Sequence, residues 1–145
     1  METTIRFTVR GEPQGKGRPR IVRNGAFSRA YTPETTVLYE NLIKLEYQRY
    51  CKDVCFMEGC VGMAITAYFS IPKTTSKRKR ALMIDGQIYP VKKPDCDNVA
   101  KCVCDALNGL AYKDDSQISD LRIVKRYAEI PKIVVDIWGI KEEQP

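Results

Sequence analysis

The sequence contains no histidine. Any general base or metal ligand must therefore be a carboxylate, lysine, tyrosine, thiol or water, which excludes Ser-His and Cys-His catalysis. A glycine-rich nucleotide cradle of the P-loop or dinucleotide type is also missing, so the pattern disfavours activity on a small nucleotide. No internal repeat or low-complexity segment interrupts the chain.

Long apolar runs are absent as well. No stretch approaches the roughly 18–20 apolar residues that a membrane-spanning helix needs. The segment Met1–Arg6 has neither the basic start nor the apolar stretch of a secretory signal. We therefore expect a cytoplasmic protein with no membrane partner.

Cysteine is plentiful but not in pairs of the zinc-finger type. The six cysteines are Cys51, Cys55, Cys60, Cys96, Cys102 and Cys104. Their spacing differs from the C-x2-C pairs of structural zinc sites, and no histidine is present to complete one. In the cytosol thiols stay reduced, so we expect free cysteines that behave as small buried hydrophobic residues.

Positive charge exceeds negative charge, with 24 Lys and Arg against 18 Asp and Glu, a net charge of +6 and a pI of about 9.0. A basic balance favours polyanionic partners such as nucleic acid, although many basic proteins bind none. With 145 residues the chain is long enough for one domain with its own hydrophobic core.

Periodicity predicts the order of the elements. Strands are expected at residues 4–9, 61–70, 117–129 and 132–138, the last from the alternation of Ile133, Val135 and Ile137. We expect one helix that Thr32 caps and that runs to about Tyr50, a short helix that Ser76 caps and that reaches Met83, and a third helix that follows Asp97. The first helix is expected to face the core with Val37, Leu38, Ile43, Leu45 and Tyr47. This order predicts an α+β fold, a single compact domain over residues 1–145 with a mixed β-sheet and helices packed on one face.

Two segments concentrate basic residues. The first is a Gly- and Pro-rich loop after the first strand, with Lys16, Arg18, Arg20 and Arg23; the second carries Lys73, Lys77, Arg78, Lys79 and Arg80. Flexible glycines beside arginines suit close approach to phosphates, whereas cations in the first turn of a helix oppose its dipole and suggest another use. We interpret both segments as DNA-binding. A solvated surface explains them about as well, and the second also resembles a nuclear-targeting signal.

Acid is concentrated around the third helix. Asp95 and Asp97 are two residues apart in what we expect to be an extended segment, so their carboxylates point the same way. Two carboxylates held that close repel unless a cation lies between them, and Mg²⁺ prefers such ligands with waters. Asp114 and Asp115 precede the next strand and offer a third ligand, while Lys101 lies one helical turn after Asp97.

A purely structural interpretation of these residues remains open. Asp97 is a good helix N-cap, and Asp97 with Lys101 makes an ordinary surface ion pair at i, i+4. Asn108-Gly109 is a good stop for the same helix, whose core-facing side chains are expected to be Val99, Cys102, Val103, Ala106 and Leu107.

The quoted motifs resemble the signature of the RusA-type Holliday junction resolvases. The matching segments are Lys93-Pro94-Asp95-x-Asp97-Asn98-x-x-Lys101, Asp105-Ala106-Leu107-Asn108-Gly109 and Tyr112-Lys113-Asp114-Asp115-Ser116-Gln117, with Gly15-Lys16-Gly17-Arg18-Pro19-Arg20 similar to the family's basic loop. The resemblance implies a homodimeric, Mg²⁺-dependent endodeoxyribonuclease that makes paired nicks in four-way DNA junctions. It implies metal-binding catalytic aspartates at Asp95, Asp97 and Asp115 and an essential lysine at Lys101. The roles of Asp114 and of the six cysteines stay open.

Two other functions are compatible with these residues. One is a branched-DNA-binding module without catalysis, in which the acidic stretch is only structural. The other is a metal-dependent hydrolase of another phosphodiester. In the nuclease hypothesis, the aspartate cluster activates a water that hydrolyses the phosphodiester bond.

Overall fold

The computed structural model describes residues 4–17, 20–31, 33–51 and 57–143. A four-stranded sheet is its centre, in the order β1-β6-β4-β5. The strands are β1 (Thr4–Arg10), β4 (Val61–Ser70), β5 (Ile118–Ala128) and β6 (Lys132–Gly139). β6 pairs antiparallel with β1 and β4, whereas β4 and β5 run parallel. The predicted mixed sheet is confirmed.

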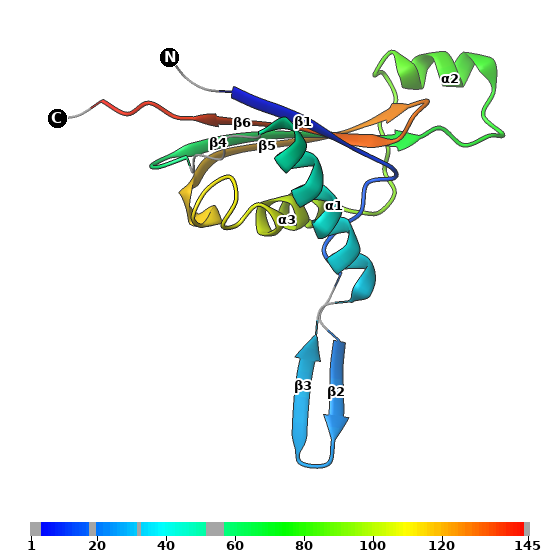
Figure 1. Ribbon diagram of the computed structural model, residues 1–145. Coiled ribbons are helices and arrows are strands. Elements are labelled where there is room, and N and C mark those ends of the chain that lie inside the picture. Colours follow the sequence, from blue (N-terminus) through cyan, green and yellow to red (C-terminus); the bar gives the residue numbers. More distant parts are fainter. Residues whose placement is uncertain (1–3, 18–19, 32, 52–56, 144–145) are drawn as a thin grey trace.

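Helices α1 (Glu34–Tyr50) and α3 (Cys96–Ala106) cover one face of this sheet (Figure 1). The alternation predicted for β6 is confirmed, because Ile133, Val135 and Ile137 are fully buried on that face. Phe7 of β1 meets Tyr47 of α1 edge to face, with ring centroids 5.7 Å apart. One core therefore joins the sheet to both helices, and α3 is held by burial of an entire side.

Helix α2 (Lys77–Ile84) lies on the other side of the sheet, near one end (Figure 1). The expectation that the helices share one face therefore holds for α1 and α3 only. The predicted Ser76 cap is confirmed, since its hydroxyl accepts from the Lys79 N–H at 3.3 Å. Only Met83 of this helix is buried, and the Arg126 guanidinium of β5 donates to the Gly86 carbonyl just beyond it. Polar contacts thus contribute much of the anchoring of α2.

The orientation of α1 differs from the expectation. Ile43 and Tyr47 are buried as predicted, but Val37, Leu38 and Leu45 are exposed. The buried stripe consists of Thr36, Tyr39, Ile43 and Tyr47 at helical spacing. The prediction was right for Ile43 and Tyr47 and wrong for three aliphatic residues, because Thr36 and Tyr39 occupy the other buried positions. The predicted cap Thr32 lies outside the described residues.

A two-stranded hairpin, β2 (Arg20–Asn24) and β3 (Phe27–Tyr31), was not predicted. It stands away from the rest of the molecule below the start of α1 (Figure 1). Gly25 begins its two-residue loop at φ +65°, a conformation that favours glycine. The segment expected to be an irregular basic loop therefore leads into a defined arm.

No helix among the described residues has the length and apolar character needed to cross a membrane.

Candidate active site

Helix α3 begins two residues earlier than expected. Asp95 is the N-cap in extended conformation, and its carbonyl accepts from the Val99 N–H at 3.1 Å. Asp97 therefore lies in the first turn, and its predicted role as the N-cap was wrong. The predicted apolar side is confirmed, since Val99 and Cys102 are fully buried, as are Val103, Ala106 and Leu107. Burial of this side fixes which way the remaining residues of α3 point.

The carboxylates at the start of α3 are left without protein partners. Asp95 and Asp97 are exposed, and neither side chain caps the helix or pairs with any side chain that the structure describes. Lys101 is exposed one turn later and forms no ion pair with Asp97. The alternative of a capping aspartate with a surface ion pair is therefore contradicted. Two carboxylates beside an ammonium, none of which has an ion pair with the part of the chain that the structure describes, are an arrangement that suits a ligand.

A polar groove runs beside Asp95. Its walls are the N-terminal loop and the start of α3, through Pro13, Gln14, Gly15, Lys16, Lys93, Pro94, Asp95 and Asn98. The Lys16 N–H donates to the Asn98 carbonyl at 3.1 Å. A Cβ on Gly15 would lie 2.9 Å from the Asn98 Cβ and 3.0 Å from the Pro94 Cβ, so only glycine fits this approach. The loop is thus docked directly on the segment that carries Asp95.

Lys16 is tied to α1 and α3 by its side chain. Its ammonium lies 2.6 Å from the Glu40 carboxylate and 3.1 Å from that of Asp105. Burial alone would lower the pKa of Lys16, but the hydrogen bonds to Glu40 and Asp105 outweigh it and raise the pKa above the usual value. Lys16 was expected to contact DNA phosphates, yet its charge is already neutralised by two carboxylates. Its position indicates that it holds the loop against both helices.

Replacing Lys16 by methionine tests this structural role. Lys16→Met leaves the partly buried Glu40 and Asp105 without their cation, so we expect a loss of about 1–2 kcal/mol in the free energy of unfolding. Lys44→Met is the matched control, since Lys44 is a half-buried lysine one turn beyond Glu40 with no ion pair among the described residues. Urea unfolding of both variants measures this difference. Equal losses of unfolding free energy would show that Lys16 stabilises the fold no more than Lys44 does.

Asp114 and Asp115 have different environments. The Asp114 carboxylate accepts from the Ser116 N–H at 3.1 Å in a capping box with Gln117, and these hydrogen bonds lower its pKa. Asp114 is therefore engaged in holding the turn η1 (Asp115–Gln117). The side chain of Asp115 has no such bond among the described residues, which leaves the second acid of the pair available.

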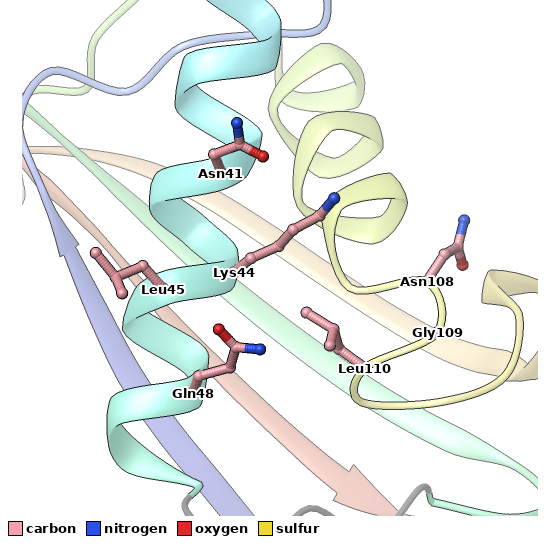
Figure 2. A pocket seen from close by; sticks show the side chains of 7 residues that line it. All are labelled: Asn41, Lys44, Leu45, Gln48, Asn108, Gly109 and Leu110. Carbon is pink, nitrogen blue, oxygen red and sulfur yellow. The ribbon is translucent and has the colours of Figure 1, made fainter.

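Asn108 fixes the backbone of Asp115. The sequence predicted Asn108 only as a helix stop and did not predict this second role. Its side-chain oxygen accepts from the Asp115 N–H at 2.8 Å. Asn108 also lines a hollow between α1 and the loop after α3, where Lys44 extends from α1 toward that loop (Figure 2). An amide two residues after the end of a helix is a common local acceptor, and this signal was present in the sequence.

The described aspartates do not form a preformed metal-binding site. Within the described ranges, no three Asp, Glu, Cys or His side chains are grouped closely enough to hold a metal ion. Burial, with the charges of Asp115 and Asp105 as smaller causes, raises the pKa of the Cys104 thiol to about 11. The donor chemistry nonetheless fits Mg²⁺, which binds through one or two carboxylates and keeps several waters.

The two basic segments lie on different sides of the molecule. The hairpin with Arg20 and Arg23 extends from the side of α1 and α3, whereas α2 lies across the sheet (Figure 1). Arg18 is outside the described residues. Lys73, Lys77, Arg78 and Lys79 are exposed, and Arg80 pairs with Glu129 at 3.7 Å. The predicted DNA-binding residues therefore form two surfaces rather than one, and only the hairpin side adjoins Asp95.

Comparison with known proteins gives two findings. Residues 10–138 match the family model described as endodeoxyribonuclease RusA. The uncharacterised protein YqaN of Bacillus subtilis (strain 168) is 39% identical over 136 residues, which cover 92% of this chain and 94% of that protein. Both matches span the groove, α3 and η1.

Proposed function

Because the chain belongs to the RusA endodeoxyribonuclease family, we propose that it resolves four-way DNA junctions as a homodimer, by Mg²⁺-dependent paired nicking. The observation that supports this most strongly is the pair of exposed carboxylates, Asp95 and Asp97, with no protein partner among the described side chains beside a polar groove. Two carboxylates only two residues apart along the chain repel each other unless a cation lies between them, which supports a role for this pair as ligands of a cation from solution.

The residues around the start of α3 have different proposed roles. Asp95 and Asp97 would hold Mg²⁺ with its waters, and Asp115 would supply the third carboxylate from η1. When bound, the ion neutralises charge on the phosphate and lowers the pKa of the attacking water. Lys101 is free to contact the scissile phosphate or the leaving oxygen. The first-turn N–H groups of α3 add partial positive charge for an incoming phosphate.

A homodimer suits paired nicking, since two identical sites related by a two-fold axis can address two strands of a junction with approximate two-fold symmetry. The basic residues of each subunit would contact phosphates, so binding should weaken steeply as salt rises.

The test is cleavage of a synthetic four-way junction and of a linear duplex with the same arm sequence, each with Mg²⁺ and with EDTA. We expect symmetrical nicks in the junction only, and only with Mg²⁺. Junction binding without cleavage would indicate the non-catalytic binding module. Cleavage of duplex and junction at equal rates would indicate a different phosphodiester hydrolase.

A further inference from the structure

Residues 21–30 of the β2–β3 hairpin do not contribute to the hydrophobic core. Every residue from Ile21 to Ala30 is exposed, and the arm stands clear of the sheet and helices (Figure 1). Its Phe27, next to the turn, is 82% exposed. Burying a phenylalanine side chain is strongly favourable, so one presented at the tip of an arm suggests a partner outside the fold.

One face of the hairpin collects the residues that a partner would meet. In the register, Val22 pairs with Arg29 and Asn24 with Phe27, so these side chains lie on the same face. The same four residues line a shallow hollow. The face therefore combines an aromatic ring, an aliphatic side chain and a guanidinium.

Charge identifies the class of partner. Residues 17–33 contain no acidic residue, and their cations are Arg18, Arg20, Arg23 and Arg29. A cationic arm that ends in an exposed ring matches a polyanion with flat apolar surfaces, the combination that nucleic acid offers through its phosphates and its bases. In a continuous duplex the base faces are covered by stacking. At a branch point they become accessible.

The arm is rooted beside the candidate active site. Three residues before β2, the Gly17 N–H donates to the Thr36 hydroxyl of α1 at 2.9 Å, and a Cβ on Gly17 would lie 2.6 Å from that oxygen. One residue earlier, Lys16 is hydrogen-bonded to the carbonyl of Asn98 on α3. DNA whose backbone enters the groove at Asp95 therefore runs close to the base of the hairpin.

We propose that Phe27 stacks on an exposed base at the branch point of a DNA junction, so that the hairpin selects branched over linear DNA. This inference rests on the proposed function, because it assumes that junction DNA is what the groove receives. It adds a specificity-determining residue that is separate from the aspartates and from Lys101.

The experiment compares Phe27→Ala, Phe27→Leu and Phe27→Tyr with a matched control, Ile21→Ala. The control removes an exposed aliphatic side chain from the opposite face of the same hairpin, outside the hollow. The full-length variants are titrated in EDTA against a fluorescent four-way junction and its linear duplex. A parallel titration uses 2-aminopurine at the branch point, which brightens when it leaves its neighbours. The mass of each variant in solution is measured by sedimentation.

We expect Phe27→Ala and Phe27→Leu to bind the junction about tenfold more weakly and the duplex almost unchanged, with loss of the 2-aminopurine signal. Phe27→Tyr should bind like the wild type, as should Ile21→Ala. Equal junction binding by all variants, or wild-type junction binding by the leucine variant, would overturn stacking. A change of mass in the Phe27 variants would assign the ring to contact between protein copies and overturn the proposal.

This outcome is separable from that of the proposed function. If the wild type cuts junctions with Mg²⁺ but the Phe27 variants bind them normally, only the role of Phe27 fails. If the wild type neither binds nor cuts junctions, both the proposed function and the role of Phe27 fail.

Discussion

Asp97→Asn is expected to lower the rate of junction cleavage by about 10³-fold or more while leaving the fold and junction binding intact. The change keeps the size of the side chain but removes the charge that would hold Mg²⁺. Asp97 is exposed and bonded to no described side chain, so loss of its charge should cost only the interaction of a first-turn acid with the helix dipole, about 1 kcal/mol or less. Single-turnover cleavage at saturating protein, with circular dichroism and binding in EDTA, separates these effects.

The matched control is Asp120→Asn, which removes an exposed carboxylate from β5. It should cleave at the wild-type rate. Equal rates for wild type and Asp97→Asn would exclude Asp97 from catalysis. A parallel loss in Asp120→Asn would mean that the total negative charge matters rather than the position.

Ile43→Ala is expected to destabilise the protein by about 2–5 kcal/mol, whereas Leu38→Ala should cost well under 1 kcal/mol. Both residues lie on α1 and were predicted to face the core. Ile43 is fully buried between helix and sheet, but Leu38 is 60% exposed. A truncation at Ile43 leaves a cavity, and a truncation at Leu38 does not.

Chemical unfolding of the two variants measures this difference. It is run at two protein concentrations, so that a loss caused by weaker association appears as a concentration dependence. Similar, concentration-independent losses at both positions would contradict the orientation of α1.

The sequence predicted elements best where one face is buried. The prediction of β6 follows from alternation, since Ile133 and Val135 alternate with partly exposed residues, and that of β4 follows from its many β-prone residues. The hairpin escaped prediction because residues 21–30 are all exposed, so burial imposes no alternation there. Gly25 was the available signal, since a glycine at the first position of a two-residue loop is typical of a hairpin turn.

The site was predicted locally but not in space. The apolar side of α3 placed Asp97 and Lys101 away from the core, as the structure has them. The distinct roles of Asp114 and Asp115 required the capping box with Gln117, which depends on how the turn folds. Asp95 and Asp97 are close along the chain, whereas the position of Asp115 depends on the pairing of β5 beside β4. Sequence spacing could not show how far apart these carboxylates lie.

The location of the divalent ion tests the central claim most directly. The wild-type protein is crystallised with Mn²⁺ and junction DNA at a pH too low for rapid cleavage. The anomalous scattering of Mn²⁺ then locates the ion. We predict a peak at the start of α3, bound by Asp95 and Asp97 with the Asp115 carboxylate drawn toward it. A peak elsewhere, or none at this helix while DNA occupies the groove, would contradict the account.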